Sequence, residues 1–251
     1  MNRNFFKAHP WHGIQIGDQM PEQVTAFIEI VPTDTVKYEI DKQTGYLKID
    51  RPQKFSNIVP ALYGFLPQTY CSDGIAELAR KYSGKDIERG DGDPLDILVL
   101  SERAITHGDI LCQAIPIGGI RMIDKGEADD KIIAVLKDDP IYGKWKDIAD
   151  APKDIVERLR HYFWTYKMLP GETSSSAVDI DELRLYEAMC RFGQNEYVKN
   201  LICVLEQICK KVYGNDKDIP GRLLKAFALD TTEVKSLTIQ RFQRKETIPP
   251  L

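Results

Sequence analysis

The chain has 251 residues, of which 43% are hydrophobic and 29% charged, and its formal net charge is −4. A chain of this length can bury one large core, and its slightly acidic balance provides no overall basic field for binding nucleic acid. No apolar run approaches the roughly 18 residues of a membrane helix. The start, MNRNFFKAHPWHG, has no apolar segment typical of a signal peptide, and the five cysteines are scattered. We therefore expect a cytoplasmic protein with reduced thiols and no membrane partner.

From Ala26 to Arg51 the sequence is predicted to form mostly strands. AFIEIVP reads as an apolar strand with one carboxylate, Glu29, inside it. VKYEI alternates, so that Lys37 and Glu39 face one way and the apolar side chains the other. The turn DKQTG and the run YLKIDR complete a hairpin. Residues 52–70 contain three prolines and a glycine, and we expect them to be irregular.

Three further strands are expected after a polar stretch. Residues 71–90 are mostly polar, and we expect one helical turn in their middle. The runs DILVL, ILCQAIPIGGIRMI and KIIAVL are apolar enough for buried strands. The sequence has no sign of repeated strand–helix–strand units, which favours a small antiparallel barrel.

Two helices are expected after Pro140. The run APKDIVERLRHYFWTYKML has apolar residues at helical spacing, and a second apolar stripe runs from Val198 to Val212 and ends at the dipeptide GN. Beyond it the periodicity weakens. We therefore expect a β-rich α+β fold in a single domain, residues 1–214, and a C-terminal extension, residues 215–251, whose order the sequence does not indicate.

The segment GDGDPLDILVL places Asp91, Asp93 and Asp96 next to an apolar strand. Like charges this close repel, and their burial is costly unless a cation neutralises them. A solvated acidic turn is the simplest interpretation, since Asp, Gly and Pro all favour turns. A calcium-binding EF-hand loop does not fit, because Leu95 stands where a ligand is needed and Asp96 where glycine is needed.

A second acidic cluster favours a metal site over a solvated turn. MIDKGEADDK contains Asp124 and Asp129, which are five residues apart, as are Asp91 and Asp96. Side chains at this spacing do not converge on a regular strand or helix. A bent segment allows convergence, and each interval contains a turn residue, proline or glycine. Two bent acidic loops could form a cage of oxygen ligands for Mg²⁺, or for Mn²⁺ in its place.

Basic residues provide a counterpart to the carboxylates. Lys37 and Arg51 lie on the predicted hairpin, Lys131 follows the second acidic cluster, and Lys167 follows Tyr166 on the first helix. Taken singly, each is typical of a solvated surface charge. Metal ions bridge phosphate oxygens and basic side chains bind the remaining charge, so a carboxylate cage surrounded by Lys, Arg and Tyr suits a phosphoanhydride.

With these residues the sequence resembles the family I soluble inorganic pyrophosphatases. DGDPLD matches the signature of that family. The blocks KYEIDKQTGYLKIDR, LYGFLPQT, GDGDPLDILVL, IGGIRMIDKGEADDKIIAV and HYFWTYK occur in the family order over roughly residues 25–170. The resemblance implies a distorted five-stranded OB-like β-barrel with flanking helices. It implies hydrolysis of pyrophosphate to two phosphates by attack of a metal-activated water. It also implies a homo-oligomer, commonly a hexamer among bacterial members.

The resemblance assigns roles to residues of this sequence. It implies that Asp93 is the general base for the attacking water. The implied metal ligands are Asp91, Asp96, Asp124 and Asp129. Two further acidic residues, which act at the edge of the site through water or on an additional metal ion, are Glu29 and Glu39. The groups that would bind pyrophosphate and the leaving phosphate are Lys37, Arg51, Tyr63, Lys131, Tyr166 and Lys167.

The chain departs from the family pattern outside these residues. The segment 66–90 is longer than in the short bacterial members, Val59 stands where many members have tyrosine, and the chain beyond residue 214 has no counterpart. The alternative function is a non-catalytic OB-like binding or regulatory module. A module for single-stranded nucleic acid needs a basic groove with aromatic platforms, and the two acidic clusters argue against it.

Overall fold

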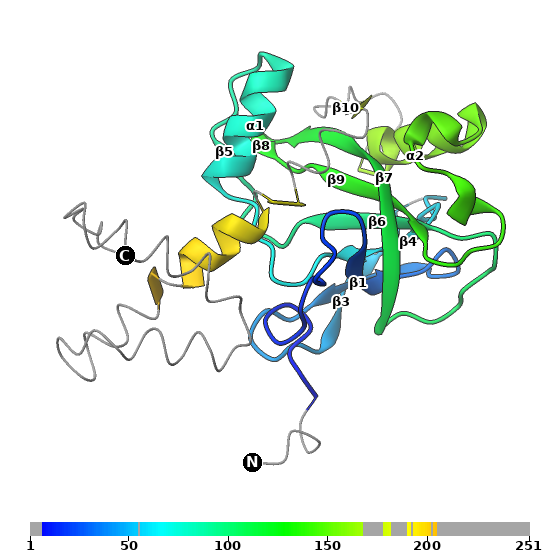
Figure 1. The fold of residues 1–251 in the computed structure, drawn as a ribbon, viewed down its shortest axis with the longest axis horizontal. Coiled ribbons are helices and arrows are strands. Elements are labelled where there is room, and N and C mark those ends of the chain that lie inside the picture. The colour runs from blue at the N-terminus through cyan, green and yellow to red at the C-terminus, as the bar shows by residue number, and fades with distance from the viewer. Residues whose placement is uncertain are drawn as a thin grey trace. The chain divides into compact units, whose positions relative to one another are not determined.

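Five β-strands pair side by side in a ring in the computed structural model of the chain (Figure 1). In the order of pairing they are β1 (Val24–Ile30), β4 (Leu62–Phe65), β6 (Asp96–Leu100), β9 (Lys131–Leu136) and β7 (Ile110–Asp124). A further pairing between β7 and β1 completes the ring. Register shifts interrupt the ladders within β1 and β7, and the ring is not closed into a true barrel. The expected distorted OB-like arrangement is confirmed.

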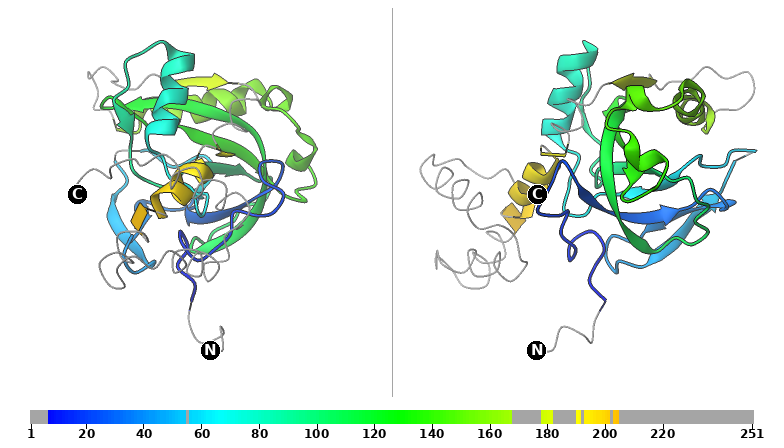
Figure 2. Two further views of the ribbon diagram at one scale, coloured as in Figure 1. Left: turned by 60° about the vertical axis from the view of Figure 1, so that its left-hand side comes forward. Right: turned by 45° about the vertical axis from the view of Figure 1, so that its right-hand side comes forward.

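One pair in the ring is parallel, which corrects the all-antiparallel sheet that we expected. β6 and β9 run in the same direction, with Asp96 opposite Lys131. Parallel neighbours need a crossover connection, and the long strand β7 provides it, since it pairs antiparallel with both β1 and β9. Figure 2 shows how strongly β7 curves along this path. The parallel register brings two of the expected site residues together.

Three short strands extend the sheet at the far part of β7. β8 (Glu127–Ala128) pairs with the end of β7, and β5 (Arg89–Gly90) pairs with β8. β10 (Val178–Asp181) pairs with β7 through Gly119–Met122.

Strand β4 lies in the segment 52–70, which we had expected to be irregular. The prolines obscured it in the sequence, and Gly64 is required by its position. A Cβ atom at Gly64 would lie 1.8 Å from the carbonyl oxygen of Phe27 on β1. Only glycine allows the two strands to approach this closely.

The polar segment 71–90 forms an 11-residue helix, α1 (Asp73–Ser83), so the expectation of a single helical turn was wrong. Its apolar residues recur at helical spacing and are buried, while charged side chains occupy the other positions. Figure 1 shows α1 beside β5 and β8. The buried residues are Ile75, Ala76, Leu78 and Ala79.

The hairpin expected from VKYEI and YLKIDR is confirmed as a separate two-stranded sheet. β2 (Val36–Ile40) pairs with β3 (Leu47–Pro52), and Lys37 lies opposite Arg51. Apart from Ile40, its side chains are half-buried or exposed.

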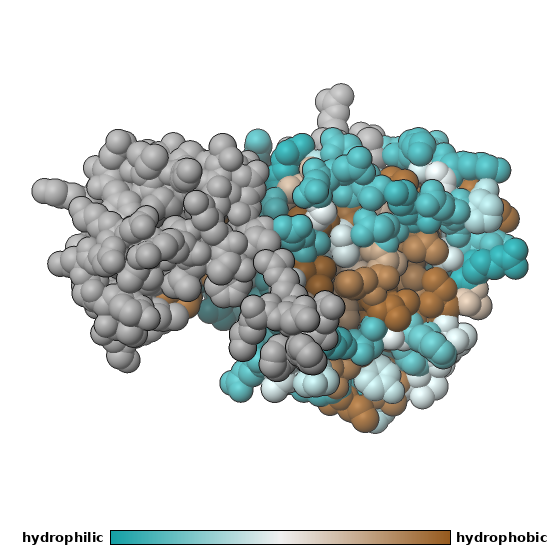
Figure 3. Space-filling model, turned by 60° about the horizontal axis from the view of Figure 1, so that its bottom comes forward, coloured by the Kyte–Doolittle hydropathy of each residue, from teal (hydrophilic) through white to brown (hydrophobic). Residues whose placement is uncertain are grey.

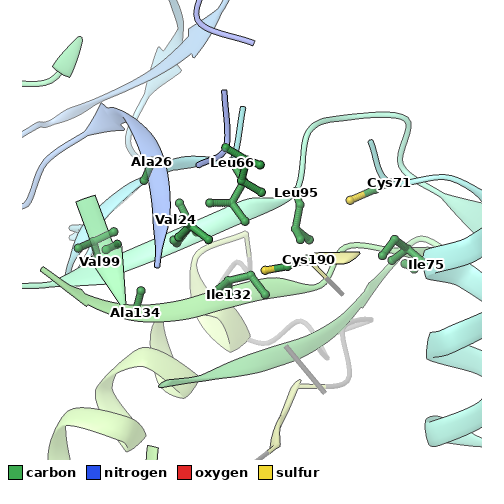
Figure 4. Packing of buried hydrophobic residues seen from close by; sticks show 14 of the residues in the cluster. Val24, Ala26, Leu66, Cys71, Ile75, Leu95, Val99, Ile132, Ala134 and Cys190 are labelled. Atoms are coloured by element: carbon green, nitrogen blue, oxygen red, sulfur yellow. The ribbon is translucent and has the colours of Figure 1, made fainter. Parts of the chain in front are cut away.

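The ring strands are buried on both faces. Alternate residues of β6 and β9 belong to two different hydrophobic clusters, as the two-residue period of a strand requires. In the first cluster Val99, Ile132 and Ala134 pack with residues of β1 and α1 (Figure 4). In the second, Leu98 and Ile133 pack with α2. This two-sided burial holds the ends of the ring strands in fixed positions.

Helix α2 (Lys153–Thr165) confirms the first expected helix, and Leu159 and Phe163 are its buried residues. Two 3₁₀ turns precede it, η2 (Tyr142–Lys144) and η3 (Ile148–Asp150). No helix among the residues that the structure describes has the length and hydropathy needed to span a membrane.

The chain forms two compact units, residues 1–194 and 195–251. The structure describes residues 7–54, 56–167, 178–181, 190–191, 193–201 and 203–204. Residues 193–201 are helical, in agreement with the start of the second expected helix. The rest of its apolar stripe, the domain boundary expected after residue 214 and the extension 215–251 lie outside the described residues.

Candidate active site

A cavity of about 300 Å³ is lined by residues of the hairpin, the ring strands and α2. All the residues for which the sequence suggested a role line this one cavity. They are Glu29, Lys37, Glu39, Arg51, Tyr63, Asp91, Asp93, Asp96, Asp124, Asp129, Lys131, Tyr166 and Lys167.

Two bent loops bring the aspartates to the cavity. Asp91 and Asp93 lie between β5 and β6, and Asp96 is the first residue of β6. Asp124 is the last residue of β7, and Asp129 precedes β9. The structure therefore brings both pairs with five-residue spacing to one cavity, as their turn residues predicted.

Asp130 belongs to the second acidic cluster but points away from the cavity lining. Its Oδ1 atom accepts a hydrogen bond of 3.0 Å from the backbone N–H of Met122, and the residue is buried. Burial raises the pKa of Asp130 to about 6. This carboxylate fixes the path of the loop between β8 and β9, so that the neighbouring Asp129 reaches the cavity.

A buried ammonium group lies between two of the aspartates. Lys131, the first residue of β9, donates to Asp96 Oδ2 at 2.8 Å and to Asp129 Oδ1 at 2.7 Å, and its side chain is 1% exposed. Its Nζ lies over the rings of Tyr63 and Phe163. Burial by itself would lower the pKa of Lys131, but the two carboxylates raise it well above the usual value. The lysine therefore stays charged and compensates the aspartates.

Two further lysines contact aspartates from outside the ring. Lys42, in the hairpin turn, forms an ion pair with Asp93. Lys167, which follows α2, donates to Asp124 Oδ2 at 2.6 Å. Burial would lower the pKa of both lysines, and their neighbours, including these carboxylates, raise it. Lys42, Lys131 and Lys167 come from three segments that are far apart in the sequence. Together they place positive charge next to the clustered aspartates of the cavity.

Asp91 is the exception, because no ion pair with it is found within the described residues. Its Oδ1 atom accepts the backbone N–H of Asp93 at 3.0 Å. Burial, followed by the charges of Asp129 and Asp96, raises its pKa well above the usual range for a carboxyl group. A bound cation would relieve this unfavourable charge.

The donor set fits a hard divalent cation. Carboxylate oxygens are the ligands that Mg²⁺ and Mn²⁺ prefer, and the cavity has them on two facing loops. Among the described residues no three acidic, His or Cys side chains are already arranged around one metal position. The aspartates are turned instead toward Lys131, Lys42 and Lys167. A bound divalent ion would compete with these lysines for the same carboxylate oxygens.

The hairpin presents hydrogen-bond donors to the same cavity. Lys37 and Arg51 share one acceptor, Asp50, at 3.1 and 3.8 Å. Arg51 Nη1 and Gln53 Nε2 are buried atoms with no hydrogen-bond partner in the structure as described. Buried donors without an acceptor are costly, and the oxygens of a phosphate would satisfy them.

Glu29 and Glu39 lie at the edge of the cavity. Glu29 is buried, and its Oε1 atom accepts the backbone N–H of Ile40 at 2.6 Å, which ties β1 to the hairpin. Burial raises the pKa of Glu29 to about 8. Tyr63 donates its hydroxyl to Asp96, and its pKa is raised well above the usual value by burial and by that carboxylate.

Sequence reasoning missed four polar residues of the cavity. They are Lys42, Gln53, Glu127 and Tyr162. Tyr162 precedes Tyr166 by one helical turn, and their rings stack with centroids 5.3 Å apart. Tyr162 was noted only as an apolar helix position, and Glu127 only as a member of the acidic cluster. Lys42 and Gln53 flank the two expected hairpin strands, and their closeness to Lys37 and Arg51 was the available signal.

The model of the family described as inorganic pyrophosphatase matches residues 26–189. The inorganic pyrophosphatases of Chlamydia muridarum and Chlamydia trachomatis serovar L2 are 57% and 55% identical to this chain, over 80% of it and 94% of each relative. The crystal structure of the inorganic pyrophosphatase from Thermus thermophilus matches with a TM-score of 0.60 and 28% identity, over 75% of this chain and 98% of that one.

Proposed function

Because the chain belongs to the inorganic pyrophosphatase family and is a hydrolase of pyrophosphate, we propose that this cavity carries out the reaction with Mg²⁺ held by its aspartates. The observation that carries the proposal is the meeting of five aspartates with lysines, tyrosines and an arginine in one cavity. The alternative of a non-catalytic OB-like module is not favoured, since the family and the structural neighbours are pyrophosphatases.

The proposed metal ligands are Asp91, Asp96, Asp124 and Asp129. Their support is the clustering of carboxylates on two loops and the raised pKa of Asp91. Bound divalent ions would lower the pKa of a water molecule and neutralise phosphate oxygens. Mn²⁺ prefers similar oxygen ligands, and we propose it as a substitute for Mg²⁺.

Asp93 is the proposed general base. Its side chain is 36% exposed in the cavity, so that water can reach it, and it lies between two proposed metal ligands along the chain. The carboxylate orients the attacking water and takes its proton. Lys42, through its ion pair, holds this carboxylate in place.

The basic and phenolic residues are the proposed phosphate-binding groups. Arg51 is suited to this role by its buried Nη1 atom without a partner, because a guanidinium group binds phosphate oxygens in a fixed geometry. The other members of the group are Lys37, Tyr63, Lys131, Tyr166 and Lys167. They hold pyrophosphate in line with the water and stabilise the leaving phosphate. Glu29 and Glu39 act at the edge, through water or on an additional metal ion.

We also propose a cytoplasmic homo-oligomer, a hexamer, with a catalytic domain of residues 1–214. Large hydrophobic side chains are exposed on the chain, among them Tyr46, Ile49 and Trp164. Figure 3 shows hydrophobic residues gathered on one face, and covering such a patch favours association. Sedimentation velocity measures the assembly, and a monomer at all concentrations would contradict it.

Phosphate release from pyrophosphate tests the proposed function. We expect the full chain to be inactive in excess chelator and active when Mg²⁺ exceeds the chelator. A control with Ca²⁺ at the same ionic strength separates a specific metal effect from a salt effect. Full turnover in chelator would exclude the metal-dependent mechanism, and no turnover with any divalent ion would exclude the activity of this cavity.

A further inference from the structure

We propose that the segment Lys7–Gly13 is a positioning element of the active site, in which His9 holds the hairpin turn so that Lys42 reaches Asp93. The segment lies before the region matched by the family model, residues 26–189. The inference rests on the proposed role of Asp93 as the general base. Lys42 contacts this base directly, and His9 acts on it through Lys42.

His9 lies between its own segment and the hairpin turn. Its Nδ1 atom accepts backbone N–H groups of Trp11 at 3.2 Å and His12 at 3.3 Å. A ring nitrogen that accepts carries no hydrogen, so the hydrogen of the neutral ring is on Nε2. Nε2 is 3.2 Å from the carbonyl oxygen of Lys42 and donates to it. One imidazole thus joins the local turn to the backbone of Lys42.

The hairpin turn is packed against the same histidine. Gly45 has a φ angle of +75°, which favours glycine. A Cβ atom at this position would lie 2.9 Å from His9 Cδ2 and 2.9 Å from Pro10 Cδ. The turn also has its own bonds, since Asp41 accepts the backbone N–H and the hydroxyl of Thr44. The turn is therefore a defined unit, placed by His9 and Pro10.

Trp11 and His12 of the same segment hold residues 68–71, which lie next to Asp93. Trp11 is buried, and its Nε1 donates to the carbonyl oxygen of Thr69 at 2.8 Å. Gln68 donates its backbone N–H to the Trp11 carbonyl and its side-chain amide to that of His12. Two residues after Thr69, the backbone N–H of Cys71 donates to the carbonyl oxygen of Asp93 at 2.8 Å. The segment Lys7–Gly13 thus contacts the hairpin turn that carries Lys42, and it also contacts residues 68–71, which bond to the backbone of Asp93.

The exposure of the Lys42–Asp93 pair explains why such support is needed. The two side chains are 50% and 36% exposed. An ion pair this exposed contributes little to stability, and a long lysine side chain loses entropy when it is held. Its geometry consequently depends on where the backbone places Lys42. The pair is kept together by the position of the turn and does not itself position the turn.

Lys42→Met tests the first link of this chain of contacts. We expect kcat to fall about 10-fold or more with little change in KM, because misplacing a catalytic group costs rate more than affinity. Lys48 is the matched control: it lies on the same hairpin, pairs with Asp41 and is not part of the cavity lining. Lys48→Met should leave kcat and KM unchanged.

Two substitutions of His9 separate its role in the local turn from its role in holding Lys42. Asn at position 9 can still accept the N–H groups two and three residues ahead, as asparagine does in turns, but it is too short to reach the Lys42 carbonyl. We expect His9→Ala and His9→Asn to lower kcat alike, by about three- to ten-fold, while His9→Asn keeps the thermal stability of the parent. Recovery of full kcat in His9→Asn would mean that the role is only local, and would overturn the proposal.

The double variant decides whether His9 acts through Lys42. If it does, adding His9→Asn to Lys42→Met should lower kcat by less than two-fold further, since the contact that His9 serves is already lost. If the loss of kcat in the double variant equals the product of the losses in the two single variants, His9 acts independently of Lys42 and the proposal is overturned. A wild-type kcat in Lys42→Met alone would also overturn it. The parent chain, assayed with Mg²⁺, tests the proposed function separately, because its inactivity would be seen before any variant is compared.

Discussion

The five-stranded ring and the β2–β3 hairpin contribute to the same cavity in different ways. The strands β1, β6 and β9 are buried almost throughout; Asp96 is the first residue of β6, and Asp129 precedes β9. The hairpin is half-exposed, with Tyr46 at 67% and Ile49 at 66%, and it carries Lys37 and Arg51. The proposed metal ligands thus stand next to the most buried strands of the described fold, whereas two of the proposed phosphate-binding groups, Lys37 and Arg51, stand on a sheet with little core of its own.

This difference follows from what each group has to bind. Buried carboxylates need a fixed geometry and a compensating cation. Lys131, or a bound metal ion, is the compensating cation at the end of the ring strands. The hairpin depends on a few polar contacts, such as the bond from Ile40 N–H to Glu29 and the bond from His9 to the carbonyl oxygen of Lys42. Substitutions of the aspartates and of Lys131 should therefore affect metal binding and stability, and substitution of Arg51 should affect substrate binding.

The largest effect is expected on the ring side, at Asp93. Asp93→Asn should lower kcat by about 10²–10⁴-fold, because an amide cannot take the proton of the attacking water. Calorimetric Mg²⁺ affinity should change less than in Asp96→Asn or Asp129→Asn, which remove proposed ligands. Asp86→Asn, on an exposed residue outside the cavity, is the control. Near-normal kcat in Asp93→Asn would refute the assigned base.

Removal of the buried ammonium should destabilise the ring without metal. Lys131→Met leaves Asp96 and Asp129 uncompensated, and breaking a buried ion pair in this way costs about 3–5 kcal/mol. Urea unfolding in chelator should show this loss, and Mg²⁺ should restore part of it. Lys144→Met, at an exposed position, serves as the control. Equal stability of Lys131→Met and the parent in chelator would show that the pair carries no such energy.

A hairpin substitution should separate substrate binding from metal binding. Arg51→Lys keeps the charge but loses the planar donors, one of which is the unpartnered Nη1. We expect KM for pyrophosphate to rise about 10-fold with a smaller change in kcat, as for a lost charge-assisted hydrogen bond. The initial-rate assay should show no change for Arg103→Lys, which is exposed. An unchanged KM in Arg51→Lys would remove the hairpin from the phosphate site.

The burial of Glu29 should be visible in the pH dependence of stability. The pKa of Glu29 is raised from 4.5 to about 8. Between these two pH values the folded protein therefore keeps a proton on Glu29 that the unfolded chain has released. This contribution to stability is complete below about pH 4.5 and is lost as the pH rises toward 8. In chelator, Glu29→Gln should flatten the decline by up to about 1.4 kcal/mol per pH unit. A decline of unchanged slope would contradict the shift, and Glu22→Gln is the exposed control.

The smallest effect is expected from the C-terminal extension. A chain that ends at Asn215 keeps both the ring and the hairpin, and we expect kcat and KM within about two-fold of the parent, since the described residues that line the cavity all lie before position 168. A chain that ends before Glu196 would lose the apolar stripe of residues 198–212, and we expect it not to fold stably. Activity and sedimentation of both chains decide this. Joint loss of activity and assembly at Asn215 would make the extension structural.

The sequence predicted the acidic half of the site better than the basic half. Asp91, Asp93 and Asp96 lie within six residues of one another. Because their charges repel, their closeness in the sequence already indicates a site that binds a cation. Lys42 and Gln53 look like ordinary polar residues beside a hairpin, and only the folded chain shows that they face the same cavity. Proximity in space between distant segments leaves little trace in a single sequence.

The fold shows a similar division. Strands with continuous apolar runs were recognised, because burial on both faces requires such runs. Helix α1 was missed because charged residues separate its apolar ones, and β4 because prolines flank it. The parallel pairing of β6 with β9 depends on the path of β7, which no local pattern specifies. These elements are determined by tertiary packing.

Calorimetric titration of Mg²⁺ into three proteins tests the central claim most directly, namely that the aspartates at the ring strands bind the metal and that Arg51 of the hairpin binds phosphate. The proteins are the parent chain, Asp129→Asn on the ring side and Arg51→Lys on the hairpin. We predict that Asp129→Asn loses most of the Mg²⁺ affinity, by about 10-fold or more for a lost charged ligand, and that Arg51→Lys keeps it within about two-fold. Equal Mg²⁺ affinity in all three proteins, or equal losses in both variants, would contradict this division of the site.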